Sequence, residues 1–209
     1  LGYSSPTVIQ IHGGDQILIT NEASVSAHDP TTGRELWNHP WPGASDGDAN
    51  TSQPMVAGKN RVLISKGYGG GAEMFEVVKS EKGEFSTTSI WRNPQVLKTK
   101  MTSPVIDGQH AYGLSDRILE CVDLNTGQRV WKNGRYGHGQ LLLINGHLMI
   151  HAERGFLAAV PATPNGYEEL GRIDTIRGIC WNTLCTSDQF VLLRSDLEAA
   201  CFRINTPNR

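Results

Sequence analysis

Short apolar runs alternate with tight turns along the whole chain, and this pattern predicts antiparallel β-strands throughout. In the segment SPVIDGQHAYGL, which starts at Ser103, two β-rich runs flank the pair Asp107-Gly108. Asp-Gly and Asn-Gly between such runs are strong hairpin signals, because a type I′ turn needs a positive φ at both central residues. Comparable turns are expected at Gly13-Gly14, Gly58 to Asn60, Asn145-Gly146 and Ser187-Asp188. No segment shows a helical period longer than one turn.

The strongest signal is an internal repeat. Residues 22–37, EASVSAHDPTTGRELW, and residues 116–131, DRILECVDLNTGQRVW, carry an acidic residue, an Asp, a Thr-Gly pair and a Trp at identical offsets. The two copies start 94 residues apart, which is two units of about 47 residues. A closing segment from Asp196, DLEAACFRINTPNR, fits the same frame without the Trp, and weaker copies start at Glu153 and lie around Met74 to Trp91. Each unit predicts four short antiparallel strands in roughly 35 to 50 residues, the size of one β-propeller blade.

We therefore predict an all-β chain of about five four-stranded antiparallel blades in one domain, residues 1–209. The expected blade units are residues 4–37, 52–91, 103–131, 139–173 and 181–209. A β-sandwich would also have many short strands, but it would not repeat Thr-Gly-x-x-x-Trp. An aromatic residue at one fixed position suits blades that all contact their neighbours in the same way. Trp37, Trp91 and Trp131 are therefore predicted to be structural residues between blades.

The motif A-x-D-x-x-T-G-x-x-x-W resembles the repeat motif of the PQQ-like propeller family. Its first copy consists of Ala27, Asp29, Thr32, Gly33 and Trp37. Its second copy has Cys121 in the Ala position, followed by Asp123, Thr126, Gly127 and Trp131. The resemblance is strong over residues 5–37 and 103–131 and looser over the rest of the chain. Members of this family typically form rings of seven or eight blades, so the resemblance implies an open arc, the C-terminal part of a larger propeller.

The resemblance also carries the expectations about function. The family includes PQQ-dependent alcohol and sugar dehydrogenases, the propeller lipoprotein of the bacterial outer-membrane assembly machine, and many secreted bacterial repeat proteins. A quinoprotein dehydrogenase needs calcium ligands and a catalytic Asp, and the alcohol dehydrogenases also have adjacent cysteines; no position here matches these. The leading hypothesis is therefore a non-catalytic, periplasmic or secreted scaffold that binds a protein or small ligand without a cofactor. The alternative is an oxidoreductase whose ligands for PQQ and calcium lie in N-terminal blades absent from this sequence.

Strand order predicts where binding would occur. The loops between second and third strands share one face with the connections between blades, and we call this the loop face. Loops at one end of a rigid scaffold often carry binding residues, and the candidates are Glu22, Asp116, Arg117, Glu153, Arg154, Arg194 and Asp196. Arg117 and Arg154, from neighbouring units, could together clamp a carboxylate or phosphate. The acidic residues have a second interpretation, because they could satisfy turns at the same position of each blade.

Composition limits the partners and metal sites that can be expected. The net charge is −2, with 19 Lys and Arg against 21 Asp and Glu and no block of like charges, so we expect no nucleic-acid partner. No apolar stretch is long enough for a membrane span. The segment Asp46 to Asn50 begins like a calcium loop, but Thr51 stands where the sharp-turn Gly should be, so no metal site is predicted. The cysteines, without a CxxC pair, are predicted to be buried small hydrophobic residues: Cys121, Cys180, Cys185 and Cys201.

Overall fold

The computed structural model describes residues 2–43 and 49–204, and within these ranges the chain forms β-strands and no helix. No helix that could cross a membrane therefore occurs among them. Five antiparallel sheets follow one another along the sequence, and in each sheet consecutive strands are neighbours. The all-β prediction and the number of sheets are confirmed.

The first sheet contains β1 (Thr7–Ile11), β2 (Gly14–Thr20), β3 (Ser24–His28) and β4 (Glu35–Pro40). The second contains β5 (Met55–Ala57), β6 (Arg61–Lys66), β7 (Gly71–Lys79) and β8 (Phe85–Asn93). The third contains β9 (Val105–Asp107), β10 (His110–Ser115), β11 (Ile118–Asp123) and β12 (Arg129–Arg135). The fourth contains β13 (Gln140–Ile144), β14 (His147–His151), β15 (Phe156–Pro161) and β16 (Gly171–Asp174). The fifth contains β17 (Cys185–Ser187), β18 (Phe190–Arg194) and β19 (Ala199–Arg203).

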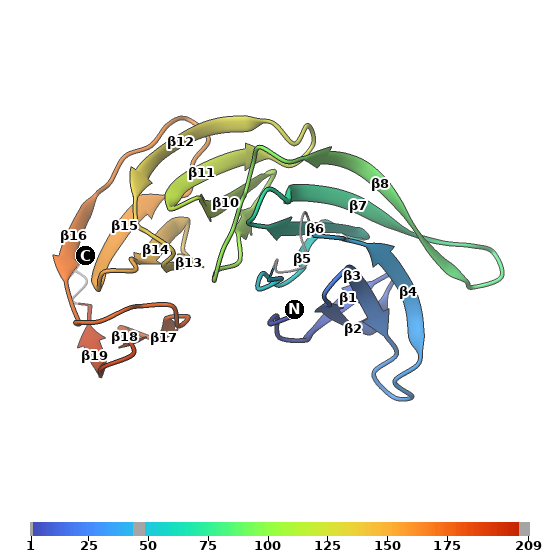
Figure 1. The fold of residues 1–209 in the computed structure, drawn as a ribbon, viewed down its shortest axis with the longest axis horizontal. Coiled ribbons are helices and arrows are strands. Elements are labelled where there is room, and N and C mark those ends of the chain that lie inside the picture. The colour runs from blue at the N-terminus through green and yellow to red at the C-terminus, as the bar shows by residue number, and fades with distance from the viewer. Residues whose placement is uncertain (1, 44–48, 205–209) are drawn as a thin grey trace.

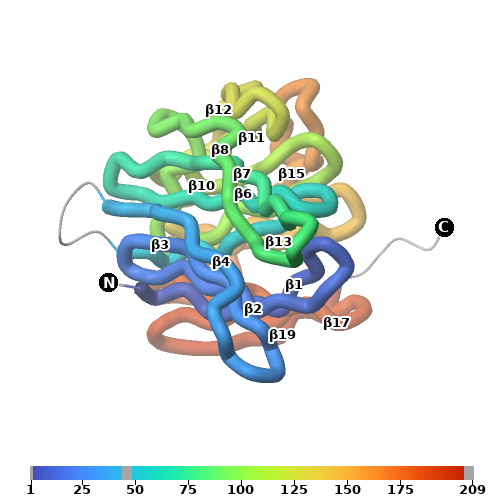
Figure 2. Tube along the Cα trace, turned by 90° about the vertical axis from the view of Figure 1, so that its right-hand side faces the viewer, coloured from blue at the N-terminus to red at the C-terminus, as the bar shows by residue number. Residues whose placement is uncertain are grey.

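The five sheets are arranged as an open arc, with the first and last sheets at its two ends (Figure 1). The fourth strands β4, β8, β12 and β16 lie on the outer rim, whereas β5, β9 and β13 lie towards the centre, where β9 contacts both β5 and β13 (Figure 1). In the side view of Figure 2 the strands run back and forth between the two faces of the arc. This arrangement is that of propeller blades, and the expected open arc is confirmed.

The D-x-x-T-G motif forms the turn between the third and fourth strands. Asp29 Oδ1 accepts hydrogen bonds from the backbone N–H groups of Thr31 and Thr32 at 2.9 and 2.8 Å and from Thr32 Oγ1 at 3.0 Å. Gly33 follows with a φ of 72°, which favours glycine. The hydrogen bonds from Thr32 and Thr31 lower the pKa of Asp29. The second copy repeats the turn with Asp123, Asn125, Thr126 and Gly127. The motif recurs because each blade needs the same turn.

The repeated tryptophans contact the following sheet. Trp37 is buried, whereas Trp91 and Trp131 are half-buried. The contacts are an edge-to-face packing of Trp37 on Phe75, and hydrogen bonds from the Nε1 atoms of Trp91 and Trp131 to the carbonyl oxygens of Leu124 (2.8 Å) and Thr163 (2.9 Å). The indole ring packs between adjacent blades, and its N–H group adds a directional hydrogen bond between them.

The core consists of four buried clusters, one at each junction between neighbouring sheets. The middle sheets are covered on both faces, so β6 and β10 are buried at every position after the first. In the last sheet, by contrast, the apolar sequence FVLLR of β18 is buried only at alternate residues. Phe190 and Leu192 are therefore 45% and 52% exposed. The arc thus ends in an uncovered apolar sheet face.

Two sequence expectations need correction at this end of the arc. The fifth sheet has three strands among the described residues instead of the expected four; residues 205–209 lie outside them. Cys121 and Cys180 are buried as predicted, but Cys185 and Cys201 are exposed. Both exposed cysteines pair across the strands with Leu192, so they share its uncovered face. A small apolar residue is buried only where a neighbouring sheet covers it.

Candidate functional site

The loops between second and third strands are bonded to the connections between sheets. The N–H of Tyr136, which follows β12, donates to the Arg117 carbonyl in the β10–β11 loop at 3.0 Å. The Glu153 N–H, in the β14–β15 loop, donates to the Tyr136 carbonyl at 2.8 Å, and the Cys180 N–H donates to the Glu153 carbonyl at 3.0 Å. Each loop is therefore held between the connections on either side of its sheet. These contacts place the loops and connections on one face, as the strand order predicts.

Two of the predicted acidic residues fix these connections. Glu153 Oε2 accepts a hydrogen bond from the His138 N–H at 3.1 Å, and its Oε1 accepts one from Trp181 Nε1 at 2.9 Å. In the next unit, Asp196 Oδ1 accepts a hydrogen bond from the Ile179 N–H at 2.7 Å. Burial alone would raise the pKa of Glu153, but these hydrogen bonds outweigh burial and hold the pKa below its ordinary value. Both carboxylates therefore serve the architecture, in agreement with the turn interpretation of the acidic positions.

The sequence interpretation missed the glycines that accommodate these carboxylates. Gly137 and Gly178 have φ values of 69° and 95°, and a β-carbon on either would overlap the side chain of Glu153 or Asp196, respectively. Each glycine directly precedes the residue whose N–H binds the carboxylate. The glycines could have been noticed in the sequence, since one lies in the connection before each of the two sheets. Only the fold shows that each lies against the acidic residue of the sheet that follows.

Asp116 lies near three lysines, two from the connection between the second and third sheets and one from β12. Lys98 Nζ lies 2.6 Å from Asp116 Oδ2, and Lys100 Nζ lies 3.9 Å from Oδ1. Lys132 Nζ donates to Ser115 Oγ at 3.2 Å. Burial would raise the pKa of Asp116, but the hydrogen bond and charge of Lys98, with the other two lysines, lower it on balance. Three ammonium groups around one carboxylate leave this part of the loop face positively charged.

Two predicted residues, Arg117 and Arg154, line the same cavity of about 310 Å³ between the third and fourth sheets. Arg135, the last residue of β12, is the third arginine in its lining, and we call it the arginine cavity. Tyr136, Gly137, Glu153 and Phe156 complete the lining. None of the three guanidinium groups forms an ion pair with a described residue. Because Glu153 is the one carboxylate in the lining, the three guanidinium groups leave the cavity with a net positive charge.

Arg117 also has an unusual backbone. The β10–β11 turn has φ values of 48° at Asp116 and 74° at Arg117, a left-handed conformation that glycine, asparagine and aspartate favour over arginine. Arg117 Nε donates to His138 Nε2 at 3.1 Å. Burial lowers the pKa of His138, and the charges of Arg117 and Lys100 lower it further. An unfavourable residue held in a strained turn beside a cavity is a feature of functional sites.

The other two candidates lie apart from the arginine cavity. Glu22 is in the β2–β3 loop, where its carbonyl accepts a hydrogen bond from Asn50 Nδ2 at 2.8 Å. Arg194 is the last residue of β18 and is exposed. The structure therefore brings together Arg117, Glu153 and Arg154, and adds Arg135, which the repeat frame did not single out.

The described residues contain no group of three or more His, Cys, Asp and Glu side chains placed to hold a metal ion. Residues 46–48 of the segment compared with a calcium loop lie outside the described residues. The quinoprotein hypothesis, which places its ligands in other blades, stays a prediction.

Solved structures with the same fold are distant in sequence. BamB from Moraxella catarrhalis matches 93% of this chain with 16% identity and a TM-score of 0.67, and this chain spans only 56% of its length. Kluyveromyces lactis Hsv2p matches 97% of the chain with 9% identity and a TM-score of 0.58, over 60% of its own length. The computationally designed Ika8 protein matches 96% of the chain with 13% identity and a TM-score of 0.53, over 71% of its length. These matches show the fold alone.

No curated protein matches the chain in sequence. A family model described as outer membrane protein assembly factor BamB matches residues 1–133, and these residues contain both strong copies of the repeat motif. The chain therefore belongs to this family of PQQ-like propellers.

Proposed function

We propose that this chain is part of a non-catalytic propeller scaffold that works outside the cytoplasm and binds a protein partner through its loop face. The family description, an assembly factor for outer membrane proteins, supports both the location and a role in protein assembly. The chain spans about half the length of the Moraxella catarrhalis protein, so the activity of the whole protein is part of this proposal.

The observation that carries the proposal is the arginine cavity. Arg117, Arg135 and Arg154 converge on it from two neighbouring sheets, and the single carboxylate in the lining, Glu153, leaves the positive charges in excess. Guanidinium groups bind carboxylates through paired hydrogen bonds, and an interface is strongest where such anchors enter a pocket. We infer that the partner presents acidic side chains there. The adjacent lysines around Asp116 would steer such a partner to the face.

Site-specific photocrosslinking in producing cells tests this proposal. A photoreactive residue introduced as Arg154→p-benzoylphenylalanine is expected to form an adduct with one defined protein. The matched control is Lys82→p-benzoylphenylalanine, at an exposed position in the β7–β8 turn on the opposite face, which is expected to form no such adduct. In the variant that carries the photoreactive residue at position 154, the further substitution Arg135→Gln should reduce the adduct about tenfold, which corresponds to about 1.4 kcal/mol. Equal adducts from both faces would contradict the proposed interface.

The location is tested in the same cells. The protein should be recovered with the periplasmic or secreted fraction, and a reporter fused to its C-terminus that is active only outside the cytoplasm should be active. Recovery of the intact protein from the cytoplasm alone would contradict the extracytoplasmic part of the proposal. It would leave the crosslinking result to decide the binding face separately.

A further inference from the structure

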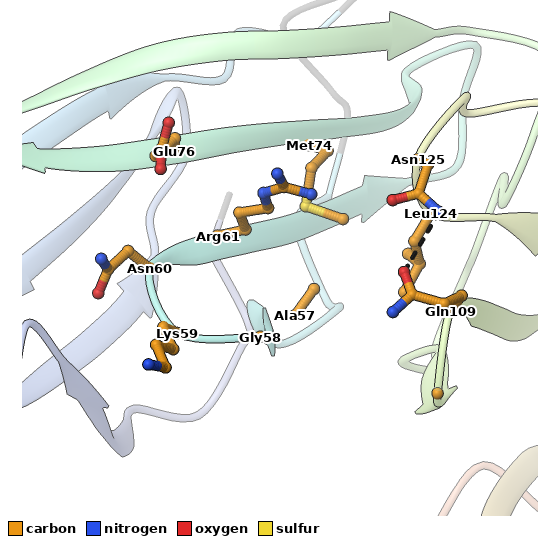
Figure 3. Close-up of a pocket in the computed structure, with 11 residues that line it drawn as sticks. Ala57, Gly58, Lys59, Asn60, Arg61, Met74, Glu76, Gln109, Leu124 and Asn125 are labelled. Atoms are coloured by element: carbon orange, nitrogen blue, oxygen red, sulfur yellow. Dashed lines mark hydrogen bonds between the residues drawn. The ribbon is translucent and has the colours of Figure 1, made fainter.

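A second cavity, of about 440 Å³, opens on the face opposite the loop face, between the second and third sheets. We call it the turn-face cavity, because the β5–β6 turn and two turns of the third sheet form its walls (Figure 3). Its volume is in the range of small-molecule sites, which run from about 300 to 1,000 Å³. It shares no lining residue with the arginine cavity, so the inference drawn from it is independent of the proposed function.

The inner part of the turn-face cavity is apolar. Met74, Leu124 and Ala57 line it and are only 1%, 5% and 8% exposed. All three belong to the buried cluster that joins the second and third sheets, so this wall is rigid. A ligand that reaches it would cover carbon atoms that already belong to the core. The cavity therefore favours a ligand with a short apolar group.

The rim of the same cavity carries two cations, Lys59 and Arg61. Neither forms an ion pair with a described residue. The one carboxylate in the lining, Glu76, is the cross-strand partner of Arg61. Figure 3 nevertheless shows the guanidinium group of Arg61 directed towards Met74 and away from Glu76. Because Arg61 is exposed, its ion pair with a carboxylate would be weak alone and would need the contacts that the same ligand makes with the apolar wall.

The third-sheet wall adds hydrogen-bond donors. Asn125 Nδ2 donates to Gln109 Oε1 at 3.2 Å (Figure 3). This bond occupies the oxygen of Gln109 and directs its Nε2 donors to solvent or to a ligand. On the opposite wall, Asn60 Oδ1 accepts the His12 N–H at 2.9 Å, which fixes the β5–β6 turn against the first sheet. Both walls are thus held in place before any ligand binds.

We propose that the turn-face cavity binds a small organic carboxylate that bears a short apolar group. The carboxylate pairs with Arg61, with Lys59 and the Gln109 amide as further donors, and the apolar group covers Met74 and Leu124. Both parts are required, because the cations alone are exposed to water and the apolar wall alone is small.

Calorimetric titration of the purified protein with N-acetyl-leucine tests the site. N-acetyl-leucine is expected to bind saturably at one site, whereas N-acetyl-leucinamide, which lacks the carboxylate, and acetate, which lacks the apolar group, should each bind at least about tenfold more weakly. Saturable binding of N-acetyl-leucinamide with equal affinity would overturn the assignment of Arg61. Absence of saturable N-acetyl-leucine binding would overturn the site altogether.

Variants locate the binding. Arg61→Gln should weaken N-acetyl-leucine at least about tenfold. The matched control Arg34→Gln removes the same charge from an exposed position in the turn before β4 and should leave the affinity unchanged. Arg154→Gln, in the arginine cavity, should also leave it unchanged. An affinity lowered by Arg154→Gln but not by Arg61→Gln would assign the carboxylate to the loop face and refute this proposal, while the crosslinking experiment would still decide the proposed function.

Discussion

Arg117→Gly is the substitution that best separates function from architecture on the loop face. Arginine at a φ of 74° carries the left-handed penalty of about 1 to 2 kcal/mol per residue, which glycine does not. Glycine costs about 0.5 to 1 kcal/mol in return, because it leaves the unfolded chain more freedom. The lost hydrogen bond to His138 starts from an exposed side chain and costs at most about 1 kcal/mol. These contributions largely cancel, and we expect a stability between about 1 kcal/mol lower and about 1.5 kcal/mol higher than that of the unchanged protein.

The partner interaction should weaken whichever way the stability changes. Arg117→Gly removes one guanidinium group from the arginine cavity, so the crosslinked adduct formed at position 154 should fall about tenfold. Arg117→Ala provides the comparison, because it removes the same group but keeps the strained φ. Its stability should be about 1 kcal/mol below that of the glycine variant, with the same loss of adduct.

Urea denaturation followed by tryptophan fluorescence measures the stabilities, and adduct yield measures binding. The reasoning is refuted if Arg117→Gly lowers the free energy of unfolding by more than about 1 kcal/mol, because Arg117 would then be a structural residue. An unchanged adduct in both variants would equally show that the strained arginine serves no interaction at this face.

Four further outcomes are expected. Trp131→Ala should lower stability by about 3 kcal/mol, the lower end for deleting a large aromatic, because the ring is half-buried and its bond to Thr163 is lost; no change in the urea midpoint would refute its place between blades. The uncovered apolar face at Phe190 should make the isolated chain self-associate in sedimentation experiments, and a compact monomer would contradict this. The hydrogen bond from Arg172 lowers the pKa of Glu169, so its stabilisation is complete above about pH 4.3 and is lost as pH falls through the lowered pKa; Glu169→Gln should flatten that loss. Titration with PQQ and calcium should show no saturable quinone binding, and micromolar binding would favour the oxidoreductase alternative.

The sequence predicted the sheets well, because each blade must solve the same local problem. The turn after the third strand needs a side-chain oxygen to cap two N–H groups and a residue with positive φ, and Asp29 with Gly33 supplies both. The same need at Asp123 makes the solution visible as a repeat. Hairpin turns followed the same logic: Asn145 and Gly146 both have positive φ, at 48° and 73°.

What the sequence could not supply is which surfaces meet. The run FVLLR in β18 has the composition of a strand covered on both faces, yet Phe190 and Leu192 are exposed because no sheet follows in the described residues. The exposed positions of Cys185 and Cys201 have the same cause. Burial at a blade face is a property of the neighbouring sheet, and a pattern read along one strand does not contain it.

The sequence did not predict the two cavities for a related reason. The pair Asp116-Arg117 shows that neighbouring residues at one repeat position can have different roles. Both residues recur in frame with Glu153 and Arg154, so the sequence does not distinguish the role of the acid from that of the arginine. In the structure the acid turns towards the connection, where Asp116 meets Lys98 and Glu153 meets a backbone N–H. The arginine turns into the space between two sheets. The two carboxylates are bonded to the connections and serve the fold, whereas the charges of Arg117 and Arg154 form no ion pair with a described residue and are available to a ligand. Binding on this scaffold is therefore expected from cations that form no ion pair with a described residue, and Arg117, Arg135 and Arg154 are such cations.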